Sequence, residues 1–168
     1  MGVTPALRAA FAKLRWVGAA DGAASIIVPC KNVSAWRADW DASSKGVAEV
    51  IRVGKGDALV IGDPGPTAVH RIDDGVIILK RTIGSGPEVL AAALSVPEGD
   101  WKRSKQTLRL AADRLVVLDA GNPPPKKLPS GADVEAGVYT IDVHAGYATR
   151  VGRARVEVQL VRLRRRPQ

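Results

Sequence analysis

The sequence predicts a mainly β (α+β) fold: about nine mostly antiparallel strands in a twisted sheet, sandwich or half-barrel, with an N-terminal helix and one short central helix. The first observation is that residues 47–83 form consecutive Val- and Ile-rich runs separated by turn residues. The turns fall at residues 54–56, 63–66 and 73–75. The second is that residues 58–61 and 76–79 are apolar at every position, which predicts strands covered on both faces. We therefore expect residues 47–83 to form the centre of the sheet. Strands and helices do not alternate along the chain, which argues against a parallel, doubly wound fold.

The N-terminal helix begins where Thr4 can cap it and where Pro5 needs no hydrogen-bond partner for its nitrogen. Its apolar stripe consists of Leu7, Phe11 and Leu14. This spacing places the three side chains on one face, so residues 1–15 are expected to pack as a helix on the rest of the domain. A short strand follows at residues 25–28 and ends at Pro29.

Residues 30–46 are polar and irregular but contain Trp36 and Trp40. A tryptophan buries about 150–250 Å² when it is packed, so neither ring is expected to stand in water. The two rings either anchor the segment on the core or form part of a binding surface. Asp39 and Asp41 flank Trp40 and make this a local acidic patch on a basic protein.

A second helix is expected from Pro87, with Val89, Leu90, Ala93 and Leu94 on its apolar face. Residues 101–105 are expected to form a basic segment that connects this helix to the next strand. Strands are expected at residues 107–110 and 115–118, followed by a proline-rich loop over residues 122–133.

A cleanly alternating strand starts at Gly137, and residues 144–152 are expected to turn the chain around. The last strand points Val156, Val158 and Leu160 inward. The alternation then reverses at Val161 and Leu163, which predicts a bulge or a strand that leaves the sheet.

The length of 168 residues fits a single domain over residues 1–168. The 25 Lys and Arg exceed the 17 Asp and Glu and give a net charge of +8. This charge is compatible with a nucleic acid, an anionic membrane or an acidic protein as partner, or simply with a solvated basic surface. Cys30 is the single cysteine, which favours a reducing compartment, and we expect a cytoplasmic protein. No apolar run approaches the roughly 20 residues of a membrane-spanning helix, so no membrane partner is expected.

The sequence contains few residues suited to catalysis. His70 and His144 form no metal-binding motif, and nothing near Cys30 indicates a paired histidine. Residues 54–56 resemble a phosphate loop only superficially, because the next element is a strand rather than a helix. We therefore expect no enzyme activity, no catalytic residues, no metal and no cofactor.

Seven arginines occur in the last 20 residues: Arg150, Arg153, Arg155, Arg162, Arg164, Arg165 and Arg166. We expect residues 164–168 to form a basic C-terminal tail. In a nucleic-acid-binding protein such arginines would contact phosphates. The few aromatic residues nearby make this the alternative, and a solvated tail or a contact with an acidic protein is preferred.

The order of several short motifs resembles the immunity proteins of bacterial polymorphic-toxin systems, of the Imm21 type. The motifs before residue 50 are Leu14-Arg15-Trp16-Val17, Ile26-Ile27-Val28-Pro29, Trp36 and Asp39-Trp40-Asp41-Ala42, the last similar to a D-Y-D-x-A element. The later motifs are residues 56–64 with Thr67, Lys80-Arg81, residues 115–119 and Gly137-Val138-Tyr139. The resemblance covers residues 14–163.

This resemblance implies a non-catalytic protein that binds a cognate toxin and neutralises it by occlusion. The expected toxin-binding residues are Trp36, Asp39, Trp40, Asp41 and Arg81. The strongly basic charge indicates a toxin with an acidic contact face. The alternative is a basic nucleic-acid-binding protein that uses the C-terminal arginine cluster.

Overall fold

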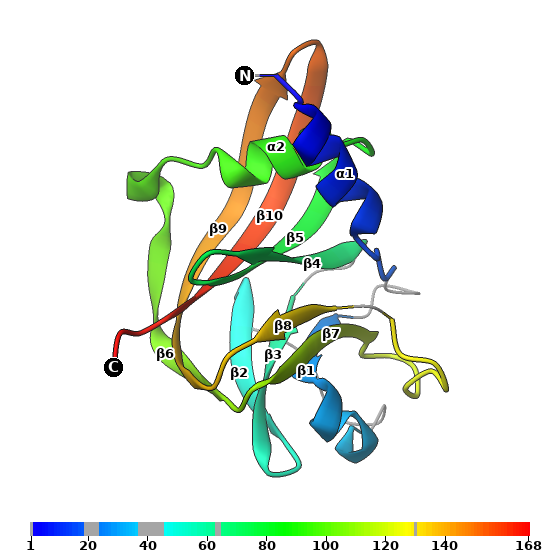
Figure 1. Cartoon of the computed structure of the whole chain (residues 1–168), viewed down its shortest axis with the longest axis vertical. Coiled ribbons are helices and arrows are strands. Elements are labelled where there is room, and N and C mark those ends of the chain that lie inside the picture. The colour runs from blue at the N-terminus through cyan, green and yellow to red at the C-terminus, as the bar shows by residue number, and fades with distance from the viewer. Residues whose placement is uncertain (1, 19–23, 37–45, 63–64, 130) are drawn as a thin grey trace.

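The computed structural model of the chain describes residues 2–18, 24–36, 46–62, 65–129 and 131–168. In these residues ten strands form two five-stranded antiparallel sheets (Figure 1), which confirms the mainly β fold. The first sheet has the order β2 (Ala48–Val53), β3 (Gly56–Ile61), β1 (Ser25–Pro29), β7 (Asp113–Asp119) and β8 (Ala132–Val134). The second has the order β4 (Thr67–Ile72), β5 (Gly75–Ile83), β10 (Ala154–Arg165), β9 (Gly137–Val151) and β6 (Lys102–Leu110).

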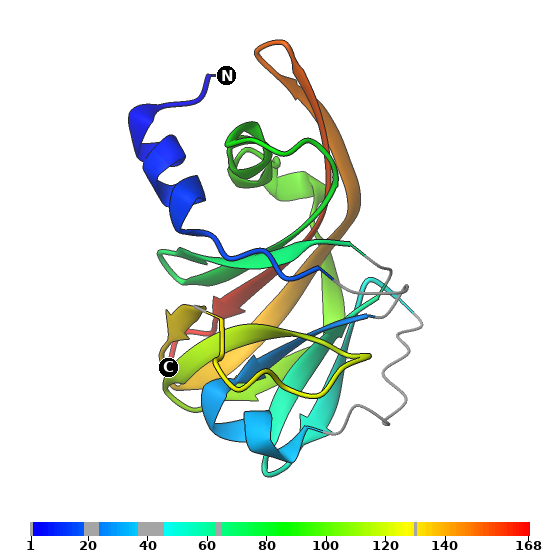
Figure 2. The same ribbon diagram turned by 90° about the vertical axis from the view of Figure 1, so that its right-hand side faces the viewer.

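Two α-helices and two short 3₁₀ helices complete the described elements. They are α1 (Pro5–Lys13), α2 (Glu88–Leu94), η2 (Cys30–Ala35) and η3 (Glu98–Asp100). The predicted start of α1 is confirmed, because the Thr4 hydroxyl accepts a hydrogen bond from the Leu7 amide at 3.2 Å. In Figure 2, α1 and α2 lie together at one end of the second sheet, away from the first sheet.

The main hydrophobic core lies between the two sheets. It contains side chains from both, including Ile27, Leu59, Ile78, Tyr139 and Leu163, all at most 1% exposed. The prediction that residues 58–61 and 76–79 are covered on both faces is confirmed, since all eight are buried. Their remaining side chains enter two smaller clusters, one beneath α2 and one beneath η2.

Strand β10 lines two different cores with its two faces. Val156, Val158 and Leu160 pack beneath α2, whereas Val161 and Leu163 pack between the sheets. The reversed alternation predicted from the sequence therefore marks the point where burial changes from one face to the other. β10 pairs irregularly with β5 and β9 near this point, and each neighbour has one more residue than β10 there. The bulges thus occur in the neighbouring strands rather than in β10.

The expectation that residues 47–83 form one sheet centre is wrong. They form two hairpins, β2–β3 in the first sheet and β4–β5 in the second, and each hairpin lies at an edge. The central strand is β1 in the first sheet and β10 in the second. They begin at Ser25 and Ala154, 129 residues apart in the sequence. Pairing between distant segments cannot be deduced from a local pattern of apolar residues.

Four local expectations also need correction. Residues 102–105 belong to β6 rather than to a connector, and residues 30–35 form η2 rather than irregular chain. Strand β9 continues to Val151, so the turn at residues 144–152 contracts to the hairpin end near Gly152. Strand β10 extends to Arg165, two residues into the predicted tail. None of the described helices is long and apolar enough to cross a membrane.

The two-sided burial of β3 can be tested by shortening one side chain. Leu59 is fully buried between the sheets, and Leu59→Ala should lower the free energy of unfolding by about 2–5 kcal/mol, because it removes buried methyl groups and leaves a cavity. The same substitution at Leu94, which is 45% exposed, should cost less than about 0.5 kcal/mol. Urea unfolding followed by circular dichroism measures both values, and equal losses would contradict the assigned packing.

Candidate functional site

Trp36 follows η2 and packs in the cluster on the outer face of the first sheet. The residue is 3% exposed, so the ring anchors its segment on the core, which is one of the two roles the sequence allowed. It has almost no surface left for a partner. Asp39, Trp40 and Asp41 lie outside the described residues.

Arg81 lies on β5, and its guanidinium carbon is 4.8 Å from the centre of the Trp16 ring. This cation–π contact holds the connection between α1 and β1 against the second sheet. Two backbone hydrogen bonds of 2.9 Å between Val17 and Thr67 fix the same connection to β4. Arg81 therefore has an intramolecular contact, and it remains partly exposed.

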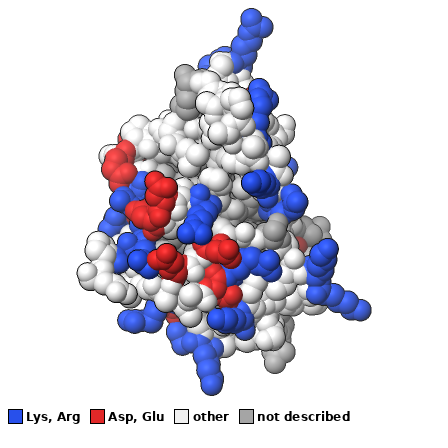
Figure 3. All heavy atoms as spheres, in the orientation of Figure 1, with Lys and Arg blue, Asp and Glu red and all other residues white. Residues whose placement is uncertain are grey.

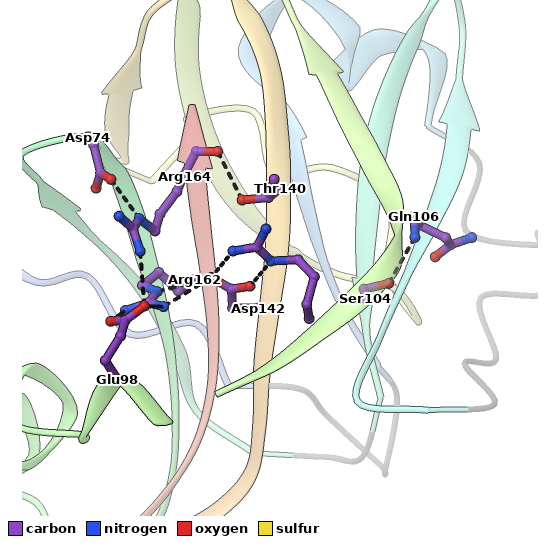
Figure 4. A network of polar contacts seen from close by, with 9 residues as sticks. Asp74, Glu98, Ser104, Gln106, Thr140, Asp142, Arg162 and Arg164 are labelled. Atoms are coloured by element: carbon purple, nitrogen blue, oxygen red, sulfur yellow. Dashed lines mark hydrogen bonds and ion pairs between the residues drawn. The ribbon is translucent and has the colours of Figure 1, made fainter. Parts of the chain in front are cut away.

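The C-terminal arginines of β10 belong to an ion-pair network on the face of the second sheet that carries α2 (Figure 4). Arg162 contacts Glu98 at 2.7 Å and Asp142 at 3.0 Å, and its guanidinium lies 4.4 Å from the centre of the Trp101 ring. Arg103 forms a second ion pair with Asp142. On the face drawn in Figure 3, acidic side chains gather in one region among basic ones.

Arg164 and Arg165 are also paired. Arg164 contacts Asp74 at 2.6 Å and Glu98 at 3.1 Å, and Arg165 pairs with Glu135. Three of the four arginines that end the chain therefore have acidic partners within the protein. Arg166 alone among these four has a side chain with no ion pair to a described residue.

Two members of the network, Glu98 and Arg162, have pKa values shifted toward their charged forms. The hydrogen bond from Arg162 holds the pKa of Glu98 below its usual value. Burial opposes the charge of Arg162, yet the hydrogen bonds to Glu98 and Asp142 raise its pKa. These charges stay fixed near neutral pH, and they stabilise the position of η3 and β6 against β10.

The residues most suited to catalysis lie in different surroundings. His70 is on β4, and burial lowers its pKa below the usual value. His144 packs edge-on against Trp101 and Tyr147, and the Cys30 sulfur contacts Arg114 Nε at 3.4 Å. Within the described ranges, no group of three His, Cys, Asp or Glu side chains could hold a metal ion.

A groove of about 770 Å³ opens beside the β2–β3 turn, the β6–β7 turn and the residues after β10. We call it the basic groove. Its lining includes the apolar surfaces of Pro29, Leu110 and Val138. Its basic lining residues are Lys31, Arg52, Lys55, Arg109, Arg165 and Arg166, and its acidic ones are Asp57 and Asp113. The volume lies within the range of ordinary ligand sites, about 300–1,000 Å³.

Both carboxylates of the basic groove are already engaged by the protein. Asp57 pairs with Arg52 at 2.6 Å and accepts a hydrogen bond from the Arg109 amide at 2.9 Å. Asp113 accepts one from the Lys31 amide at 2.9 Å. The basic groove therefore combines an apolar wall with an excess of positive charge.

Among the groove cations without an ion pair, Lys31 donates a hydrogen bond from its Nζ to the Ala112 carbonyl oxygen at 3.2 Å, and the other three are Lys55, Arg109 and Arg166. Their side chains are exposed and form no ion pair with any residue that the structure describes. Three cations around one concave surface repel one another, so an anionic group placed among them would be attracted. The arrangement suits the binding of carboxylates or other anions.

Sequence reasoning did not select these three residues. The sequence places Lys55 in a predicted hairpin turn, Arg109 on the polar side of a predicted half-buried strand, and Arg166 in a predicted tail. The one local signal is that Arg109 alternates with buried Leu108 and Leu110 and must therefore point outward. No local pattern indicates that the three residues share one groove.

Comparisons with known proteins give no relative. No family model, no curated protein and no solved structure matches the chain.

Removing a buried carboxylate of the ion-pair network should lower the free energy of unfolding more than removing a carboxylate outside it. The Asp142 side chain is 2% exposed and contacts two arginines, so Asp142→Ala should lower the free energy of unfolding by about 3 kcal/mol. The matched change Glu157→Ala removes a contact of 4.0 Å between exposed groups and should cost less than about 1 kcal/mol. Chemical denaturation measures both, and a loss at Asp142 no greater than at Glu157 would contradict a stabilising network.

Proposed function

We propose that this chain is an immunity protein of the polymorphic-toxin kind: it binds a cognate bacterial toxin and neutralises it by occlusion, without catalysis. The observation that carries the proposal is the basic groove, where three uncompensated cations surround an apolar wall. The order of short motifs over residues 14–163 supports the same class. We also propose the cytoplasm as the compartment, in line with the single free cysteine, Cys30.

The basic groove favours a protein ligand with an acidic, partly apolar segment. Opposite charges accelerate the encounter of two proteins and disfavour partners of the wrong charge. Of the apolar lining residues named above, Val138 is partly exposed and can lose water-accessible area to a ligand, whereas Pro29 and Leu110 are already buried beneath it. Charge and apolar area together suit an acidic loop or strand of the toxin better than a small anion.

A stable complex buries about 1,600 Å² in total, which exceeds the surface of one groove. The interface must therefore extend over the rims of the basic groove, onto the β2–β3 hairpin, the β6–β7 turn and residues 166–168. Arg81 and the segment that holds Asp39, Trp40 and Asp41 remain proposed contacts. Trp36 serves this interface by fixing the start of that segment to the core.

The alternative function, nucleic-acid binding by the C-terminal arginines, has less support from the geometry. Arg162, Arg164 and Arg165 would have to exchange carboxylate partners inside the protein for phosphates. Such an exchange is unfavourable for Arg162, whose pair with Asp142 is buried, whereas the pairs of Arg164 and Arg165 join exposed side chains and oppose it less. Of the four arginines between residues 162 and 166, Arg166 is the one that could contact a phosphate without such an exchange.

Charge reversal in the basic groove tests the proposal. The proposal expects a large secreted protein to be encoded beside this chain; the probe is the C-terminal domain of that protein, and titration calorimetry measures its affinity for the chain. Lys55→Glu with Arg109→Glu should raise the Kd by about 100-fold or more, because attraction becomes repulsion. Growth of a bacterial host that expresses the toxin domain should then no longer be rescued.

The matched control is Lys102→Glu with Lys105→Glu, two exposed lysines of β6 outside the groove lining. This control changes the net charge by the same amount and should change the Kd by less than about threefold. Equal losses for both variants would show that net charge rather than the groove governs binding. A wild-type chain that neither binds nor rescues would overturn the proposal itself.

The non-catalytic part of the proposal has a separate test. The triple variant with Cys30→Ala, His70→Gln and His144→Gln should neutralise the toxin as well as the wild-type chain does, because occlusion needs none of these groups. Host growth measures neutralisation, and circular dichroism checks that the variant is folded. Loss of rescue by a folded variant that still binds the toxin would indicate catalysis.

A further inference from the structure

The hairpin of β9 and β10 ends in a projecting tip with an unusual charge arrangement. In Figure 1 the hairpin extends beyond α2 at one end of the long axis of the molecule. Val151 pairs with Ala154, and the turn between them contains Gly152, whose φ of +61° suits a glycine. Arg150 and Arg155 are direct partners across the two strands.

Two arginines directly opposite each other repel, and a third, Arg153, lies in the turn that joins them. All three are exposed. The acid nearest to them in the described contacts is Glu157, which lies 4.0 Å from Arg155 and leaves Arg150 and Arg153 without an ion pair to a described residue. In Figure 3 basic side chains mark the same end of the molecule. The tip therefore concentrates positive charge that the described part of the chain does not neutralise.

The inner side of the tip is held by the hydrophobic cluster beneath α2. Val151 and Val156 are 2% and 0% exposed and pack in this cluster, so the hairpin backbone is fixed although its arginines are free. A fixed backbone reduces the entropy that a ligand must overcome when it orders the three side chains. The tip is therefore a prearranged, positively charged surface that can bind anions.

We infer that the β9–β10 tip binds the phosphate backbone of a nucleic acid without reading its sequence. Guanidinium groups form paired hydrogen bonds with phosphate oxygens. No large apolar residue is exposed on the tip: the exposed large hydrophobic residues among those described are Ile83 and Leu94. Stable protein interfaces depend on such apolar or aromatic anchors, whereas phosphate contacts depend on charge alone.

This surface is separate from the basic groove and from the ion-paired arginines Arg162, Arg164 and Arg165. None of its three arginines lines the groove, and none takes part in the network around Asp142. The groove adjoins the β2–β3 turn, which lies toward the opposite end of the molecule from the tip in Figure 1. A nucleic acid and a protein partner could occupy the two surfaces together.

Fluorescence anisotropy with a labelled 20-base-pair DNA duplex of random sequence tests the inference. The wild-type chain should bind at 50 mM salt, and its affinity should fall steeply with added salt. Arg150→Gln with Arg155→Gln should weaken binding by about tenfold and reduce the slope of log K against log salt by about 1.8, since two phosphate contacts are lost. The melting temperature of this variant should equal or exceed that of the wild-type chain, because the repelling pair is gone.

The control is Lys102→Gln with Lys105→Gln, which removes two charges from the exposed side of β6. It should leave affinity and salt slope within about twofold of the wild-type values. Equal weakening in the two variants, or no binding by the wild-type chain at 50 mM salt, would overturn the inference. So would equally tight, equally Arg150- and Arg155-dependent binding of poly-glutamate, which would show a site for any polyanion. The result is independent of toxin binding, which the groove variants measure.

Discussion

The second sheet is covered on opposite faces at its two ends, and this constraint organises the rest of the structure. One end of β10 turns Val156, Val158 and Leu160 toward the helices, and the other turns Val161 and Leu163 toward the first sheet. The two sets lie on opposite faces of β10, so each face of the sheet is apolar at the end where the helices or the first sheet cover it. The extra residues in β5 and β9 change the local pairing where the two burial patterns meet.

The same constraint determines where charged residues must be neutralised internally. Beyond the cover of α2, the helix-facing side of β9 and β10 carries Asp142, Arg162 and Arg164. Asp142 is 2% exposed, and an unpaired carboxylate there would be strongly unfavourable. Arg103 and Arg162 neutralise it, and Trp101 covers the guanidinium of Arg162. Much of the basic C-terminal cluster is thus part of the scaffold.

Two of the surfaces at which basic side chains lack an ion pair with a described residue differ in shape and surroundings. Lys55, Arg109 and Arg166 line a groove in which partly exposed Val138 adds apolar area, whereas Arg150, Arg153 and Arg155 lie on a projecting hairpin tip that exposes no large apolar side chain. This difference in shape and surroundings is the basis on which we propose a protein partner for the first surface and infer a phosphate backbone for the second. Net charge alone could not separate the two, since both surfaces contribute to the same +8.

The sequence by itself determined the elements whose signals are local: the cap at Thr4, the start of α2, the strands between residues 47 and 83, and the reversal of burial near Val161. These follow from turn residues and from the spacing of apolar side chains, which act over a few positions. Only the tertiary structure decided that residues 47–83 divide between two sheets, that Arg162 and Arg164 are ion-paired, and that Lys55, Arg109 and Arg166 share one groove. Each of these depends on pairing between segments far apart in the chain. The energies that select such pairings belong to contacts that no local window of sequence contains.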